Sequence, residues 1–122
     1  MTNEPLKYPR LCLHTITTRA WNLEEAIGNY AQAGLGGITI WRQALEGCDA
    51  PAVGRMARQA GLQVVSLCRG GFFPAVTRSK RQAALDDTRR ALEQAAQLGA
   101  PLLVLVPGAA PGQSLQASRA QI

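Results

Sequence analysis

A short phrase recurs three times along the chain of 122 residues, in which a helix-forming stretch ends at a glycine and an apolar run follows. The three copies are Ala33-Gly34-Leu35, Ala60-Gly61-Leu62 and Leu98-Gly99-Ala100. Glycine ends a helix readily because it adopts the left-handed backbone conformation that closes the last turn. The repeat therefore predicts helices that alternate with strands, which is the pattern of β/α units feeding a parallel sheet.

Four short apolar runs are the predicted strands, and they cover residues 11–15, 37–41, 63–67 and 102–106. The fourth run is wholly apolar, which predicts a parallel strand that is covered on both faces. Residues 68–78 are expected to form a loop after the third strand. Pro107 and Gly108 then interrupt the chain after the fourth strand.

Three amphipathic helices are predicted between these strands. Asn22 and Glu25 have the spacing of a capping box at the start of the first helix, and Pro51 suits the first turn of the second. The third helix spans about residues 79–98, and a fourth helix begins before the last residue. The faces expected to be buried are Leu23, Ala26, Ile27 and Tyr30; Val53, Met56, Ala57 and Ala60; and Leu85, Thr88, Leu92 and Ala95.

The spacing of the repeat predicts half of an eight-unit β/α barrel. The intervals from Gly34 to Gly61 and from Gly61 to Gly99 bracket the roughly 31 residues per unit of a barrel of about 250 residues. We therefore expect one partial domain over residues 1–122, a truncated half-barrel with about four strands and three to four helices. A doubly wound sheet is the competing fold, but Gly36 and Gly37 precede a strand and cannot form a dinucleotide-binding turn after one.

Composition excludes several classes of protein. Hydrophobic residues make up 47% of the chain and charged residues 17%, which is typical of a globular domain. The 13 Lys and Arg exceed the 8 Asp and Glu, yet they are dispersed without interleaved aromatic residues, which disfavours nucleic acid as a partner. Cys12, Cys48 and Cys68 lack C-x-x-C spacing. Without a signal peptide or a membrane-spanning run, we expect a soluble cytoplasmic protein.

The candidate site comprises the residues at which the apolar runs end, because barrel ligands bind at the carboxyl ends of the strands. Strand alternation places Cys12 and His14 on one face, and likewise Thr39 and Trp41. His14 is the only histidine and could donate a hydrogen bond to substrate or transfer a proton; a structural histidine is the alternative. Trp41 could form an apolar wall of the pocket, or belong to the core.

Arg69 stands beside two glycines, and a guanidinium next to free backbone N–H groups can hold a phosphate or carboxylate. The alternative is a solvated loop arginine. Arg69 would lower the pKa of the neighbouring Cys68 thiol, but no base is nearby in sequence, so a small pocket-lining residue is preferred. No catalytic residue and no metal ligand is assigned. The predicted substrate-binding residues are His14, Trp41, Cys68, Arg69 and Gly70.

Four segments at these strand ends carry a family likeness that spans nearly the whole chain. They are LCLHT at 11–15, GITIW at 37–41, GLQVVSLCRGGFFP at 61–74 and LGAPLLVLVPG at 98–108, of which the third is the most specific. In these segments the chain resembles the sugar phosphate isomerase/epimerase family of xylose-isomerase-like TIM barrels. The resemblance implies a metal-dependent enzyme that interconverts ketose and aldose, or epimerises a carbon beside a carbonyl, through an enediolate.

The same resemblance implies a divalent metal cofactor (Mn, Mg, Co or Zn), whose ligands and proton-transferring glutamates come from later strands in that family. This chain is therefore expected to carry only residues that bind the sugar or sugar phosphate, and to be inactive by itself. A related branch of zinc endonucleases acts on abasic DNA. Its histidine ligands are expected at strand ends that here carry Cys68-Arg69 and Pro107-Gly108, which disfavours that activity.

One alternative function and two possible states of association stay open. The chain could be a self-standing α/β module that binds a phosphorylated or acidic ligand through Arg69-Gly70-Gly71. A half-barrel, in contrast, leaves two open sheet edges and an uncovered face. It is expected to form a homodimer or to associate with a missing half-barrel.

Overall fold

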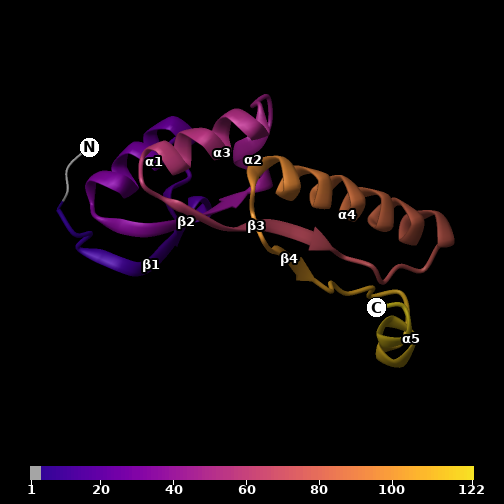
Figure 1. Ribbon diagram of the computed structural model, residues 1–122. Coiled ribbons are helices and arrows are strands. Elements are labelled where there is room, and N and C mark those ends of the chain that lie inside the picture. The colour runs from indigo at the N-terminus through magenta and orange to yellow at the C-terminus, as the bar shows by residue number, and fades with distance from the viewer. Residues whose placement is uncertain (1–3) are drawn as a thin grey trace.

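The computed structural model describes residues 4–122, whose four strands form one parallel sheet in the order β1-β2-β3-β4. This curled sheet confirms the predicted half of a β/α barrel. Helices α1, α3 and α4 lie along one face, and no helix of the described residues covers the opposite face of β1, β2 and β3 (Figure 1). The elements are β1 (Tyr8–His14), η1 (Thr15–Thr18), α1 (Leu23–Gln32), β2 (Leu35–Trp41), α2 (Arg42–Leu45), α3 (Ala50–Gln59), β3 (Gln63–Gly71), α4 (Arg78–Leu98), β4 (Leu103–Val106) and α5 (Leu115–Ala120).

The helix boundaries follow the predicted caps. The side chain of Asn22 accepts a hydrogen bond from the backbone N–H of Glu25 at 2.8 Å, and the Glu25 carboxylate accepts one in return at 3.3 Å. These two bonds form the capping box of α1. Gly34, Gly61 and Gly99 all have positive φ, between 77° and 88°. The repeated phrase is thus a repeated left-handed turn that redirects the chain from a helix into the next strand.

The hydrophobic core lies between the helices and one face of the sheet. Ile38 and Ile40 of β2 are fully buried, as is Leu67 of β3. Ile27 and Tyr30 belong to the same buried cluster and lie on α1, which packs against β2. Strands β2 and β3 are the central strands, each with a neighbouring strand on both sides and helices packed against it. Among described residues, no helix is long and apolar enough to cross a membrane.

The buried face of α4 differs from the prediction. Leu85 and Leu92 are 44% and 54% exposed, whereas Ala91, Ala95 and Leu98 are buried. The physical reason is a close approach of two helices: a Cβ added at Gly54 of α3 would lie 2.3 Å from the carbonyl oxygen of Leu98. Only small residues allow this approach, so α4 turns its alanines inward.

The prediction for α3 was also wrong in part. Val53 and Ala57 are buried, but Met56 is 36% exposed and Ala60 is exposed. Met56 and Ala60 have the helical spacing of an apolar face that is wider than the buried face observed on α3. Because α3 meets α4 through glycine and alanine, the surface that the two helices share is narrow. The outer positions on the same face of α3, Met56 and Ala60, are therefore exposed to solvent.

All four strands depart from their predicted limits, since β2 begins two residues early at Leu35 and β4 one residue late at Leu103, and β1 and β3 differ more. The expected loop at 68–78 is wrong in its first four residues, because β3 continues to Gly71. Glycine makes this possible: a Cβ at Gly71 would lie 2.3 Å from the carbonyl oxygen of Val106 on β4. Strand β1 begins at Tyr8, before the predicted start.

Strand β4 is not covered on both faces, as its apolar sequence had predicted. Leu102, Val104 and Leu105 are 60%, 39% and 49% exposed. Within residues 4–122, no strand pairs with the outer edges of β1 and β4. The sheet is therefore open at both edges and on its inner face.

Two helical glycines allow a matched test of this packing. Gly28 of α1 has nothing within 4 Å of an added Cβ, whereas Gly54 of α3 faces the backbone of Leu98. We expect Gly28→Ala to raise the free energy of unfolding by about 0.5–1 kcal/mol through helix propensity. Gly54→Ala should lower it by about 1–3 kcal/mol, because the helices must separate. Equal effects in urea denaturation would contradict the close α3–α4 contact.

Candidate functional site

A row of small polar side chains crosses the inner face of the sheet. The Cys12 thiol lies 3.2 Å from the Thr39 hydroxyl, which lies 2.9 Å from the Ser66 hydroxyl. These hydrogen bonds join β1, β2 and β3 and leave no buried polar side-chain atom of the described residues without a partner. Because side chains alternate along a strand, His14, Trp41 and Cys68 follow on the same face, two residues nearer the carboxyl ends.

His14 and Trp41 are brought together by this register. The Trp41 indole N–H donates a hydrogen bond to His14 Nδ1 at 3.0 Å. The Tyr30 hydroxyl lies 3.3 Å from the His14 carbonyl oxygen and fixes the strand end from below. A ring that accepts at Nδ1 carries its proton on Nε2 when it is neutral, so His14 presents an N–H donor.

Arg69 lies above the same indole. Its guanidinium carbon is 5.5 Å from the centroid of the Trp41 ring and 4.6 Å from that of Phe72. Such contacts hold a cation against aromatic faces while its N–H groups stay exposed. Phe72, which is 44% exposed, was not among the predicted site residues. Its place three residues after Arg69, in the same predicted loop, was the signal in the sequence that could have identified it.

Cys68 and Gly70 lie beneath this surface and are both buried. Burial raises the pKa of the Cys68 thiol, although the Arg69 charge opposes the shift. This direction is opposite to the lowered pKa that the neighbouring arginine had suggested, so the thiol is protonated at neutral pH. Gly70 leaves room for Leu103 and Leu105, whose side chains would touch an added Cβ at 3.3 Å.

The backbone N–H of Gly71, one of the two glycines predicted to form an anion cradle beside Arg69, is not available to a ligand, and neither is that of Phe72. The N–H of Gly71 donates to the Thr88 hydroxyl of α4 at 3.1 Å, and that of Phe72 donates to the Val106 carbonyl at 2.7 Å. Both groups are therefore used inside the protein. The exposed N–H donors at this place are those of the Arg69 side chain.

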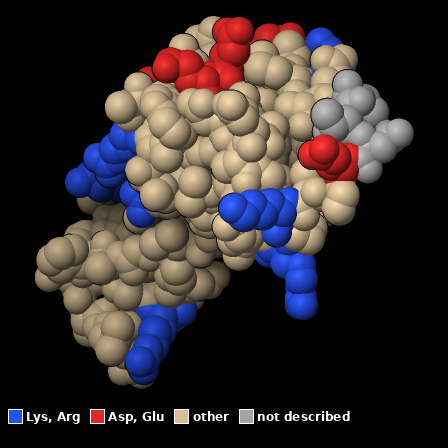
Figure 2. Space-filling view, turned by 90° about the vertical axis from the view of Figure 1, so that its left-hand side faces the viewer, with Lys and Arg blue, Asp and Glu red and all other residues tan. Residues whose placement is uncertain are grey.

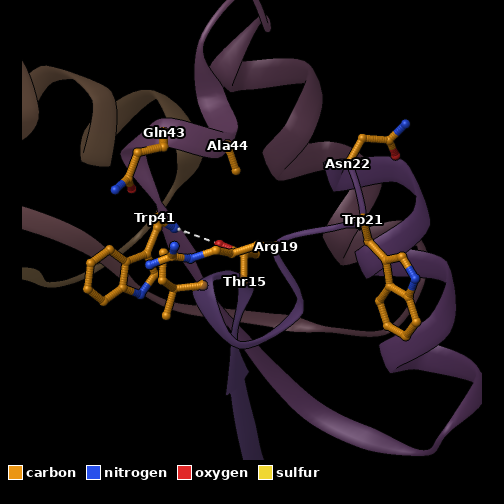
Figure 3. A pocket seen from close by; sticks show the side chains of 8 residues that line it. Thr15, Arg19, Trp21, Asn22, Trp41, Gln43 and Ala44 are labelled. Carbon is orange, nitrogen blue, oxygen red and sulfur yellow. Dashed lines mark hydrogen bonds between the residues drawn. The ribbon is translucent and has the colours of Figure 1, made fainter.

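Two clefts, each of about 370 Å³, open at the carboxyl ends of the strands. Trp41 lines the first cleft, and its indole contacts the guanidinium of Arg69, which lines the second. The first cleft, shown in Figure 3, is lined by Thr15, Ile16, Arg19, Trp21, Asn22, Trp41, Gln43 and Ala44. The second is lined by Arg42, Gln43, Glu46, Arg69, Phe72, Asp87 and Gln94.

Arg42 organises the second cleft. Its guanidinium donates to both carboxylate oxygens of Asp87 at 2.8 and 3.0 Å and to the Gln94 side chain at 2.8 Å. A further N–H reaches the Arg69 carbonyl oxygen at 3.3 Å. Hydrogen bonds from Arg42 are the main reason that the pKa of Asp87 lies below its ordinary value. This network ties α2 to α4 and to the end of β3, and its members lie too far apart in sequence to have been predicted.

The surface charge is scattered. On the face shown in Figure 2, the Lys and Arg side chains are separated by uncharged surface, and Asp and Glu side chains lie along the upper edge and apart from it at the right. This face carries no continuous basic stripe of the kind that tracks a nucleic-acid backbone.

Comparison with protein families decides the classification. A model described as xylose isomerase-like TIM barrel matches residues 27–122. The chain belongs to this family. No protein of curated function matches it.

Three solved structures share the xylose isomerase-like fold of this chain. A protein from Sinorhizobium meliloti 1021 is 40% identical, with a TM-score of 0.82 over 91% of this chain and 42% of its own. A fusion of a xylose isomerase-like TIM barrel with 4-hydroxyphenylpyruvate dioxygenase is 22% identical, with a TM-score of 0.69 over 77% of this chain and 15% of its own. A xylose isomerase domain protein from Salmonella typhimurium LT2 is 18% identical, with a TM-score of 0.69 over 86% of this chain and 39% of its own. The chain thus spans less than half the length of each.

The xylose isomerase-like resemblance had implied a divalent metal, and the side chains present do not fit one. Among residues 4–122, no three His, Cys, Asp or Glu side chains form a group that could hold a metal ion. Three of the eight acidic side chains have other partners: Glu25 caps α1, Asp86 pairs with Arg89, and Asp87 is bound by Arg42.

The His14–Trp41 pair predicts a single tautomer. We expect nitrogen-15 NMR of the neutral ring to show the proton on Nε2, and the assignment is unambiguous because His14 is the only histidine. Trp41→Phe keeps the aromatic ring but removes the donor, so the variant should show a mixture of tautomers. A proton on Nδ1 in the unaltered protein would contradict the hydrogen bond.

The Arg42–Asp87 pair predicts a pH dependence of stability. The pKa of Asp87 is lowered by folding, so the pair stabilises the protein above the unfolded pKa of about 3.9 and loses this effect as pH falls through the folded value. The difference in melting temperature between the unaltered protein and Asp87→Asn should be constant between about pH 5 and 8 and shrink below about pH 4.

Asp86→Asn is the matched control for that experiment. Asp86 pairs with the exposed Arg89 at 3.4 Å and accepts a hydrogen bond from the Gln82 amide at 3.0 Å, which an Asn oxygen can also accept. The substitution should therefore change the melting temperature little at any pH. If Asp86→Asn and Asp87→Asn behaved alike, the Arg42 network would have no special part in stability.

Proposed function

We propose that this chain is a single partial domain that forms the substrate-binding half of a cytoplasmic sugar or sugar-phosphate isomerase/epimerase. The observation that carries the proposal is the continuous row of His14, Trp41 and Arg69 across the carboxyl ends of β1, β2 and β3. A hydrogen-bond donor, an aromatic face and a cation stand there side by side. This is the end of a β/α barrel at which substrates bind.

Each group in the row suits one part of a phosphorylated sugar. The indole of Trp41 offers an apolar surface to the C–H face of the sugar. His14 Nε2–H donates to a hydroxyl, and the exposed Arg69 guanidinium pairs with phosphate through charge-assisted hydrogen bonds. Cys68 and Gly70 support this surface from below with little bulk.

Proton transfer beside a carbonyl needs an acid/base group and, by the family resemblance, a divalent metal such as Mn, Mg, Co or Zn. We assign neither to the described residues. Their role is to bind and orient the sugar so that groups on further strands act on it. By this proposal the chain is inactive until the barrel is completed.

The proposed partner is a complementary half-barrel, which would pair with the edges of β1 and β4. Leu11, Leu102, Val104 and Leu105 are 39–60% exposed along these two strands and the segment before β4. Exposed apolar side chains beside unpaired edges favour association. The greater length of the matched structures supports a complement of the same fold, and a homodimer is the competing outcome.

Binding of a ketose phosphate tests the proposed row. Titration with the ketose phosphate should shift the NMR signals of the His14 ring. Arg69→Gln should weaken the affinity for the ketose phosphate about tenfold or more, whereas this variant and the unaltered protein should bind the unphosphorylated ketose with the same affinity. Arg55→Gln, an exposed position on α3, removes the same charge and should bind as the unaltered protein does. Unchanged affinity in Arg69→Gln, or no shift at His14, would refute the proposed row.

The reaction class has its own test. A complete barrel containing these residues should exchange the hydrogen next to the carbonyl of its ketose with deuterium from the solvent, whereas the 122-residue chain should not. Isomerisation of a ketose by the metal-free chain would contradict the proposal that this chain binds the sugar and that further strands supply the reacting groups.

A further inference from the structure

The first cleft has the composition of an anion site, and among its lining residues it shares Trp41 with the row of His14, Trp41 and Arg69. It opens beside η1 and α2, between the ends of β1 and β2. Arg19 is the only charged residue in its lining, and no Asp or Glu lines it. In Figure 3 the Arg19 side chain extends from the loop after β1 toward Trp41.

The charge of Arg19 is not neutralised within residues 4–122. The ion pairs there involve Arg42, Arg89 and Arg90. Arg19 is exposed and makes no hydrogen bond to another described side chain or carbonyl. Its guanidinium therefore keeps its N–H donors for a ligand.

Two more donors face this cleft. The Thr15 hydroxyl accepts a hydrogen bond from the Trp41 backbone N–H at 3.0 Å, which leaves its own proton free to donate. Gln43 contributes an exposed amide. Asn22 also lines the cleft, but its side-chain oxygen is committed to the cap of α1. The lining thus combines a free cation with neutral donors and the indole of Trp41.

We propose that Arg19, with Thr15 and Gln43, binds an oxyanion of a small organic ligand, a carboxylate or a phosphate, whose apolar part packs on Trp41. The site lies on the β1 side of Trp41, whereas Arg69 approaches the indole from β3. The inference deepens the proposed function, because a substrate spanning Trp41 would carry an anionic group toward Arg19. It does not depend on the reaction that follows.

Titration calorimetry with a sugar acid and with a sugar phosphate tests this site. Arg19→Gln should weaken binding of at least one probe about tenfold or more, Arg19→Lys should restore part of it, and added salt should reduce the difference. Arg55→Gln is the charge-matched control. Binding of the sugar acid alone would identify a carboxylate site, and binding of the phosphate alone a phosphate site.

The two arginines separate this inference from the proposed row. Weakening by Arg19→Gln but not by Arg69→Gln supports the Arg19 site and counts against the row. Weakening by Arg69→Gln alone overturns the inference and leaves the row in place. Matching melting temperatures show that the variants compared are folded. Failure of both probes to bind the unaltered protein at millimolar concentration also overturns the inference.

Discussion

Parallel strand pairing brings all four carboxyl ends to one edge of the sheet, and the candidate site depends on this constraint. In an antiparallel sheet, successive strands would end at opposite edges. Here His14, Trp41 and Arg69 come from three neighbouring strands and meet at one edge because each crossover helix returns the chain to the same starting side. The left-handed glycines that end α1, α3 and α4 make these returns short.

The two faces of the sheet serve different purposes. The helix side holds the apolar core around Ile38, Ile40 and Leu67. The inner side carries the polar row of Cys12, Thr39 and Ser66, which fixes the register with little bulk. The site residues are therefore held in place by the strands that carry them and are open on the inner side of the sheet. Such an arrangement suits a binding surface that further polypeptide encloses.

Local signals in the sequence were enough for most of the framework. Caps such as Asn22 and terminators such as Gly99 act through the backbone of their own neighbourhood, so helix limits were predicted well. The strand ends likewise placed His14 beside Trp41 without knowledge of their hydrogen bond. The extension of β3 to Gly71 depends on a neighbouring backbone, however, and could not be predicted locally.

Tertiary distance explains the other differences. Arg42 meets Asp87 across 45 positions, and the N–H groups near Arg69 are satisfied by α4 and β4, contacts that no local pattern contains. The exposed Leu85 and Leu92 show the same limit, because helical spacing identifies an apolar stripe but not which part of it finds a neighbour. Arg19 was missed because it follows the strand end by several residues and reaches back toward Trp41.

Amide hydrogen exchange on the dilute chain tests the open parallel sheet most directly. In a parallel strand, successive residues direct their N–H groups to alternate sides, so an edge strand leaves every second amide without a partner strand. The account predicts protection along the whole of β2 and β3, with alternate amides of β1 and β4 exchanging rapidly. Continuous protection along β1 or β4 would mean that these edges are closed, and it would contradict the half-barrel on which the proposed site depends.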